Sequence, residues 1–151
     1  MCWDFKNTKR KNVTGYKVVA VNEKNGKYYS VMTGNEYPVN EDMPIWTTQK
    51  EEITLYFMCN ILDMKYVDPE EYAEERHPAW NDEMVGKTTV FIQKAQALKF
   101  RDNLIVYKHL NKREYRIVVV KARLKKGLKV ALYQLSEVYI GKRIEIISEV
   151  E

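Results

Sequence analysis

Cationic side chains are densest between positions 121 and 129 of the sequence. This segment carries five bases and no acid: Lys121, Arg123, Lys125, Lys126 and Lys129. Lysine and arginine pair with phosphate oxygens and attract acidic partners. We therefore take Lys121, Arg123, Lys125 and Lys126 as candidate binding residues for nucleic acid or an acidic partner. The simpler interpretation is a solvated surface that keeps the protein soluble.

A second candidate group lies in the stretch NGKYYS at residues 25–30. Tyr29 could stack on a planar ligand, and Ser30 could donate a hydrogen bond to it. Packing within a β-hairpin explains the same pattern, and we favour it because tyrosine is common in half-buried strands. Trp80 also has two interpretations, a lid over a pocket or an anchor that holds its loop against the core.

The tetrapeptide Gly86-Lys87-Thr88-Thr89 resembles the end of a phosphate-binding P-loop. A P-loop needs an earlier glycine, but position 81 is Asn, and Glu83 would repel phosphate. The tetrapeptide also precedes an apparent strand, whereas a P-loop opens a helix that follows one. These differences exclude a P-loop. Lys87 and Thr88 stay candidate binding residues without that motif.

Histidine and cysteine are too few for a Cys/His metal centre. The chain has two of each, at His77, His109, Cys2 and Cys59. A zinc site needs three or four such donors at close spacing, and no G-x-S-x-G nucleophile motif is present either. We therefore expect no metal and no cofactor, and the sequence favours a protein without catalytic activity.

Length and composition are typical of one soluble domain. The chain has 151 residues and a net charge of +4, and 45% of its residues are hydrophobic. We interpret residues 1–12 as a basic N-terminal arm and residues 13–151 as a single domain. No apolar run approaches the roughly 18 residues of a membrane helix. The first residues lack the apolar core of a signal peptide. The sequence therefore predicts a cytoplasmic protein without a membrane partner.

Two strands joined by a tight turn must position the tyrosine pair. Gly15–Val21 is rich in valine, which favours a strand. Asn25-Gly26 is the dipeptide typical of a two-residue type I′ turn, and with that turn Val21 would face Ser30. Alternation puts Tyr29 on one face of the sheet. The other face then carries Val19, Val21, Tyr28 and Ser30.

The other elements predict a mixed fold. Helices are expected after Thr48, after Asp68 and at QKAQALKF (93–100), and a strand is expected at KTTVFI (87–92). The apolar run YRIVVVKARL at 115–124 suits a central strand that turns at Gly127, with further short strands after it. This order predicts an α+β fold, a single domain with a largely antiparallel twisted sheet and two to three helices packed on it.

The order GYKVV, NGKYYS and TGNEY, followed by TVFIQKAQALKF and EVYIGKRIEI, resembles small uncharacterised proteins encoded by phages and prophages. The resemblance covers most of the chain. Such proteins are often accessory factors, including inhibitors of host defence systems. The resemblance implies a non-enzymatic protein that binds a host or defence component and modulates or inhibits it. Whether it acts as a homodimer is left open.

A more distant resemblance is to the ADP-ribosyltransferase fold. YKVV would be its first strand, KTTVF with QKAQALKF its second element and LSEVYIGKRIEI its third. Glu137 then stands at the position of the catalytic glutamate, Lys17 stands where Arg or His is usual, and Leu135 replaces a partner acid. The resemblance implies a divergent domain, active or inactive, that binds NAD or a related nucleotide. The remaining alternative is nucleic-acid binding through residues 121–129.

Overall fold

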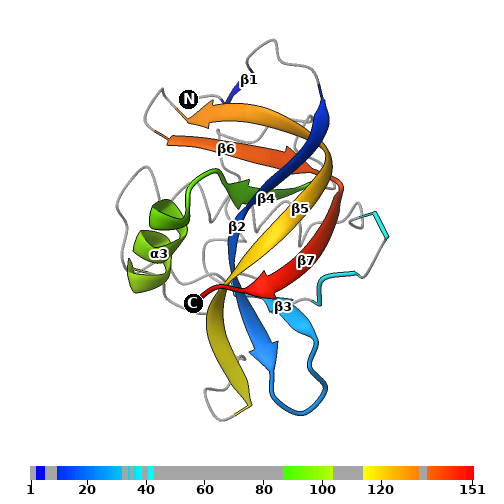
Figure 1. The fold of residues 1–151 in the computed structure, drawn as a ribbon, viewed down its shortest axis with the longest axis vertical. Coiled ribbons are helices and arrows are strands. Elements are labelled where there is room, and N and C mark those ends of the chain that lie inside the picture. The colour runs from blue at the N-terminus through cyan, green and yellow to red at the C-terminus, as the bar shows by residue number, and fades with distance from the viewer. Residues whose placement is uncertain are drawn as a thin grey trace, which may run out of the picture.

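A computed structural model describes residues 3–5, 10–31, 34, 36–38, 41–42, 87–103, 114–132 and 136–151. Within them lie seven strands and one helix (Figure 1). The strands are β1 (Trp3–Phe5), β2 (Lys11–Asn22), β3 (Tyr28–Ser30), β4 (Thr88–Phe91), β5 (Tyr115–Leu132), β6 (Ser136–Gly141) and β7 (Arg143–Glu149), and the helix is α3 (Lys94–Asn103). The pairings between these strands are antiparallel.

Four of the strands close into a small barrel. β2 pairs with β5, β5 with β6, β6 with β4, and β4 returns to β2. The predicted α+β fold with two to three helices on a twisted sheet is therefore wrong, because the described residues are mostly strand with one short helix. The strand at 87–92 and the helix at 93–100 are confirmed by β4 and α3. The helices predicted after Thr48 and Asp68 lie outside the described residues.

Strand β5 organises the sheet. It is 18 residues long. Its residues 120–124 lie between β2 and β7, and its residues 130–132 lie between β1 and β6. Val118, Val119 and Val120 are all buried, which confirms the central position predicted for this apolar run. Its pairing with β2 confirms that N-terminal and C-terminal strands share one sheet. The predicted turn at Gly127 is wrong, because Leu128 to Leu132 continue the strand along β6.

The core lies inside the barrel and under α3. Its largest fully buried side chains are Leu124, Ile140, Val19, Val90, Val119 and Val120. Helix α3 contacts β2, β4 and β5. Ala97 is buried on the helix, and the ring centroid of Phe100 lies 5.5 Å from that of Phe91 on β4. One helix face therefore covers the sheet where the strands alone would expose aromatic surface.

A glycine allows β2 to cross close to β4. A Cβ atom added to Gly15 would lie 2.4 Å from the carbonyl oxygen of Phe91 and 2.7 Å from Cγ2 of Val90. Neither distance is compatible with a real side chain. The neighbouring residue Tyr16 pairs with Phe91 and joins β2 to β4. The missing side chain at Gly15 thus permits the contact that closes the barrel.

The β2–β3 hairpin has a longer loop than predicted. Val19 faces Ser30 and Val21 faces Tyr28, so the register is shifted by two residues from the predicted one. The prediction of a two-residue turn is wrong because the Asn22 side chain accepts hydrogen bonds from the amides of Lys24 (2.8 Å) and Asn25 (3.2 Å). A shift of two residues leaves every side chain on its predicted face.

The C-terminal end of β7 is fastened to β5 by an arginine. The Arg116 guanidinium donates two hydrogen bonds to the Glu149 carboxylate, at 2.7 and 2.9 Å, and a third to Glu23 at 2.8 Å. Hydrogen bonding to Arg116 holds the pKa of Glu149 below its ordinary value. The backbone continues the pairing, since the amide of Val119 donates to the carbonyl oxygen of Glu151 at 2.6 Å.

Candidate functional site

A bend in β5 forms a corner of the barrel. Before the bend Lys125 pairs with Arg143 on β7, and after it Leu128 pairs with Ile140 on β6. Across β2 the register slips by one residue beside Lys125 and Lys126, as in a β-bulge. The bulge explains why the chain bends here instead of reversing, and it turns the side chains at the bend outward.

Lys126 has a backbone conformation that normally belongs to glycine. Its φ is 53°, in the left-handed region that costs an L-residue roughly 1–2 kcal/mol. The Lys126 amide donates a hydrogen bond to the Asn12 side chain at 3.2 Å. The next residue is Gly127, and a glycine at position 126 instead would adopt this φ without strain. Strained backbone that a fold retains is often found at functional sites.

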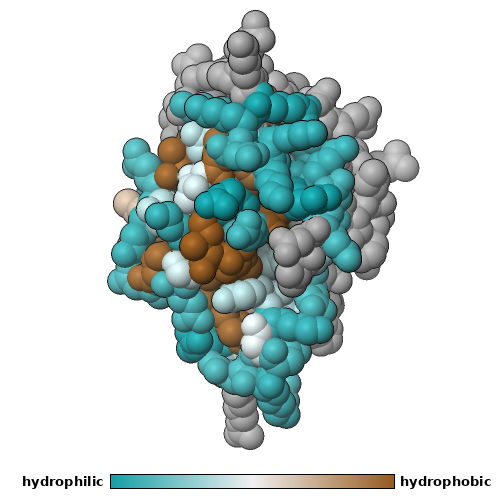
Figure 2. Space-filling model, turned by 45° about the vertical axis from the view of Figure 1, so that its right-hand side comes forward, coloured by the Kyte–Doolittle hydropathy of each residue, from teal (hydrophilic) through white to brown (hydrophobic). Residues whose placement is uncertain are grey.

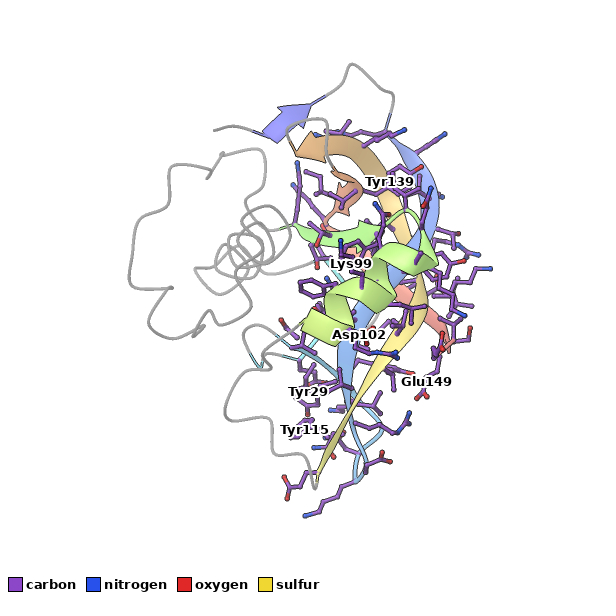
Figure 3. All side chains as sticks on the ribbon, turned by 90° about the vertical axis from the view of Figure 1, so that its left-hand side faces the viewer. Tyr29, Lys99, Asp102, Tyr115, Tyr139 and Glu149 are labelled. Atoms are coloured by element: carbon purple, nitrogen blue, oxygen red, sulfur yellow. The ribbon has the colours of Figure 1, made fainter. Side chains whose placement is uncertain are left out.

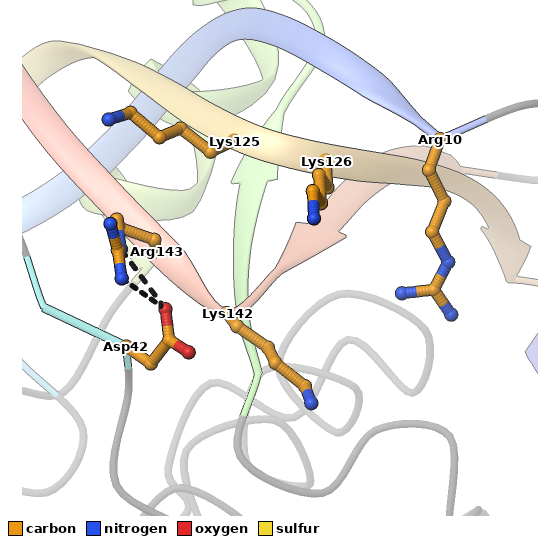
Figure 4. Close-up of a pocket in the computed structure, with 6 residues that line it drawn as sticks. All are labelled: Arg10, Asp42, Lys125, Lys126, Lys142 and Arg143. Carbon is orange, nitrogen blue, oxygen red and sulfur yellow. Dashed lines mark hydrogen bonds and ion pairs between the residues drawn. The ribbon is translucent and has the colours of Figure 1, made fainter.

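Five cations and one acid surround a hollow at this corner (Figure 4). The hollow has a volume of about 530 Å³ and is lined by Arg10, Asp42, Lys125, Lys126, Lys142 and Arg143. The formal charge of the lining is five minus one, or +4. Arg10 precedes β2, Lys142 and Arg143 come from the β6–β7 junction, and the two remaining lysines come from the bulge. Segments far apart in the sequence thus build one basic surface, which we name the basic corner.

Most of the positive charge at the basic corner is open to solvent. The Arg143 guanidinium donates a hydrogen bond from Nε to one oxygen of Asp42 at 3.0 Å, and its Nη2 lies 3.0 Å from the same oxygen as an ion pair. Among the residues that the structure describes, Lys125, Lys126 and Lys142 have no acidic partner within ion-pair distance. All three are exposed. An anion that enters the hollow would therefore meet ammonium groups that no carboxylate neutralises.

The other two predicted bases extend from the corner along the outer face of β5. Lys121 and Arg123 are exposed and alternate with buried Ala122 and Leu124. Arg123 lies 3.7 Å from the Glu145 carboxylate on β7, which neutralises part of this stripe. The structure thus brings all four predicted bases onto one side of β5, with the highest charge density at the basic corner.

In the part of the chain that the structure describes, the predicted tyrosine–serine pair makes packing contacts. The Tyr29 ring packs edge-on against Tyr115, with centroids 5.3 Å apart (Figure 3). Its hydroxyl oxygen accepts a hydrogen bond from the Asn25 side chain at 3.0 Å. Ser30 is only 1% exposed. These contacts join β3 to the β2–β3 loop and to β5, and ligand binding by Tyr29 and Ser30 stays a prediction.

The remaining predicted residues lie in the interior, in the β5–β6 ladder or outside the described part of the chain. Lys87 and Thr88 are buried, at 5% and 0% exposure. Lys17 is also buried, and its amine donates to the carbonyl oxygen of Thr89 at 2.8 Å. The backbone of Glu137 pairs with Ala131 in the β5–β6 ladder. Trp80 lies outside the described residues.

A second, smaller hollow lies next to β7. It has a volume of about 260 Å³ and is lined by Gly26, Lys27, Tyr28, Glu36, Tyr37, Pro38, Ile144, Glu145 and Ile146. Its walls combine aromatic and aliphatic side chains with two acids. Both acids have basic partners, since Glu36 lies 3.3 Å from the Lys27 amine and Glu145 pairs with Arg123. We name it the apolar hollow.

Comparison with known proteins does not assign the chain to a family. No protein-family model, no curated protein and no solved structure matches it. The resemblances to phage accessory proteins and to ADP-ribosyltransferases therefore stay predictions. Within the part of the chain that the structure describes, no group of three or more metal-ligating side chains occurs. In the same residues, no helix has the length and apolar character to cross a membrane.

Sequence reasoning found part of the basic corner and missed the rest. Lys125 and Lys126 were predicted as binding residues, and Arg10 belongs to the basic N-terminal stretch. Lys142, Arg143 and Asp42 were missed because each is an ordinary surface residue in its local sequence. The available signal was the tripeptide Gly-Lys-Arg at 141–143 between two apolar strands, which marks a cationic strand junction.

Proposed function

We propose that this protein is a non-enzymatic nucleic-acid-binding protein that acts in the cytoplasm and contacts the phosphate backbone through the basic corner. One observation carries the proposal: exposed lysines from two separate segments face one hollow with Arg10 and Arg143, and Asp42 is the acid in its lining. A phosphate chain presents regularly spaced anions, and its affinity for such a surface comes from release of bound counterions.

The strained backbone of Lys126 supports this function over a merely solvated surface. Solvation alone gives no reason to hold a lysine at positive φ, where a glycine would be relaxed. Binding does give a reason, because the left-handed conformation places a charge beside Lys142 and Arg10. The buried positions of Lys87, Thr88 and Ser30 favour binding at this corner over binding at the other predicted sites.

The test is the salt dependence of oligonucleotide binding, measured by fluorescence anisotropy with labelled DNA and RNA. We expect the logarithm of the association constant to fall with the logarithm of salt concentration, with a slope of about −2 to −4 for three to five phosphate contacts. Replacing the three lysines as Lys125→Ala, Lys126→Gly and Lys142→Ala should abolish binding at physiological salt.

The matched control removes the same charge elsewhere. Lys24→Ala, Lys94→Ala and Lys99→Ala together also lower the net charge from +4 to +1, since each triple variant loses three cations. These lysines are exposed and line neither the basic corner nor the apolar hollow. Equal loss of affinity in both triple variants would contradict the proposal, because net charge alone would then explain binding. Tighter binding to an acidic peptide than to oligonucleotides would contradict it as well.

A further inference from the structure

The basic corner and the apolar hollow adjoin along strand β7. This strand contributes Arg143 to the basic corner and Ile144 to Ile146 to the apolar hollow. Asp42 also lines the first hollow, and residues 36–38 also line the second. Successive strand residues rise about 3.3 Å, so Arg143 and Glu145 lie about 7 Å apart along β7. The two hollows are therefore neighbours on one surface.

The face that carries β7 has a hydrophobic area and a charged area side by side. In Figure 2 this side of the molecule is turned toward the viewer, and a hydrophobic area lies directly beside a strongly hydrophilic one. Ile147, beside Ile146 at an irregularity in the β5–β7 pairing, is 44% exposed. A single strand of nucleic acid likewise combines a charged backbone with bases that have flat apolar faces.

The apolar hollow is suited to a ring and poorly suited to a phosphate. Tyr28 is partly buried against the core and partly open to the hollow, while Pro38, Ile144 and Ile146 supply apolar wall. Each of its acids has a basic partner, so the surface neither strongly repels a nearby phosphate nor offers it an unpaired cation. Stacking of bases on aromatic side chains tolerates any base, because every base has a flat face.

We propose that the nucleic acid is single-stranded and that one of its bases enters the apolar hollow against Tyr28 while an adjacent phosphate lies at the basic corner. This inference rests on the proposed function and deepens it. In a duplex the bases are stacked and paired, so none can turn into a hollow beside the backbone contact. The protein therefore prefers single strands to duplexes of equal length.

The first experiment uses strands that differ only in their bases. Anisotropy titrations compare a single strand, an abasic strand of equal length with every phosphate retained, and the corresponding duplex. We expect the abasic strand and the duplex each to bind about tenfold more weakly than the normal strand. The salt slope should be unchanged for the abasic strand, because its phosphate contacts are the same.

The second experiment tests whether the bound base lies against Tyr28. Tyr28→Leu keeps an apolar side chain and removes the aromatic face, so this variant should bind normal and abasic strands equally. Tyr29→Leu is the matched control, because Tyr29 packs on Tyr115 and does not line the apolar hollow. It should keep the tenfold preference. Should Tyr28→Leu not fold, the comparison of strands with the unaltered protein decides alone.

The outcomes separate this inference from the proposed function. Equal binding of normal and abasic strands, both abolished by the three-lysine variant of the basic corner, overturns the base-binding inference and leaves the phosphate contact standing. No salt-sensitive binding to any oligonucleotide overturns both. Displacement of a bound strand by an unphosphorylated apolar peptide, with Tyr28→Leu unchanged in its preference, assigns the hollow to a protein partner and overturns the inference.

Discussion

The crossing of β2 over β4 depends on a side chain that is missing, at Gly15. A methyl group in place of the Gly15 hydrogen would clash with the Phe91 carbonyl oxygen, because an added Cβ would lie only 2.4 Å from it. The obstacle is backbone, which cannot rotate away as the end of a long side chain could. A single methyl group at position 15 would therefore disturb the contact between β2 and β4 that closes the barrel.

We expect Gly15→Ala to lower the free energy of unfolding by about 1–3 kcal/mol, the usual cost of overpacking a core. Urea denaturation followed by circular dichroism measures the change. Thr14→Ala, an exposed neighbour on the same strand, is the control and should stay within about 0.5 kcal/mol of the unaltered protein. Wild-type stability in Gly15→Ala would show that β2 and β4 do not approach this closely.

A second residue-scale expectation concerns pH. Because Arg116 lowers the pKa of Glu149 in the folded protein, the pair stabilises the fold above the unfolded pKa of glutamate, about 4.3. That contribution is lost as the pH falls through the folded pKa. In Arg116→Met, the pKa of Glu149 should return toward its ordinary value, and the acid-induced loss of stability should shrink.

Carboxyl NMR titration of Glu149 together with urea denaturation between about pH 6 and pH 2 measures both effects. Arg123→Met removes a guanidinium from another position of β5 without touching Glu149, and it should leave the Glu149 titration in place. An unchanged Glu149 pKa in Arg116→Met would contradict the role assigned to the hydrogen-bonded pair.

At the scale of elements, the bulge in β5 is the device that makes the basic corner. It lets one strand pair with β7 before the bend and β6 after it. The same bulge turns Lys125 and Lys126 outward at adjacent positions, which a regular strand would place on opposite faces. Backbone geometry, charge and the bend are therefore properties of one short segment.

Two glycine variants separate strain from charge. Lys126→Gly should raise the free energy of unfolding by up to about 1 kcal/mol, because glycine adopts positive φ without strain. Lys125→Gly removes the same charge from an extended position and should lower stability by about 0.5–1 kcal/mol. Both should weaken oligonucleotide binding to a similar extent. A Lys126→Gly variant less stable than the unaltered protein would contradict the strained conformation.

The sequence predicted the positions of the strands more successfully than the turns and pairings that connect them. The valine-rich runs and the helix at 93–100 are visible because local alternation and propensity specify them. Lys-Lys-Gly at 125–127 resembles a turn signal, and only its contacts with Lys11, Asn12 and Arg143, which are distant in sequence, make it a bend. The Asn22 side chain likewise lengthened a loop that Asn25-Gly26 indicated as short. Tertiary contacts decided the first case, and a local side-chain hydrogen bond decided the second.

For the whole molecule, stability should be highest where β5 is paired on both sides. The amides from Val120 to Leu124 lie within the pairing with both β2 and β7, and Val120, Ala122 and Leu124 are buried. Their exchange with solvent requires several strands to separate together, whereas β3 is paired with β2 over only three residue pairs.

Native-state hydrogen exchange measured by NMR tests this gradient. We expect the slowest amides in Val120–Leu124 to exchange only by global unfolding, with protection that follows the denaturant dependence of the whole domain. The amides of β3 should exchange earlier, through local opening. Equal protection of β3 and the centre of β5 would contradict a fold organised around one strand.

The separation of β2 and β5 in the chain has a consequence during synthesis. β2 ends at Asn22 and its long partner begins at Tyr115, 93 residues later (115 minus 22). At a translation rate of about 5–20 residues per second, the valine-rich strand waits about 5–20 s on the ribosome before its partner is made. During that interval the apolar side chains of β2 are unpaired, and chaperones that bind nascent chains would cover them. Cells that lack these chaperones should therefore accumulate this protein as insoluble aggregates.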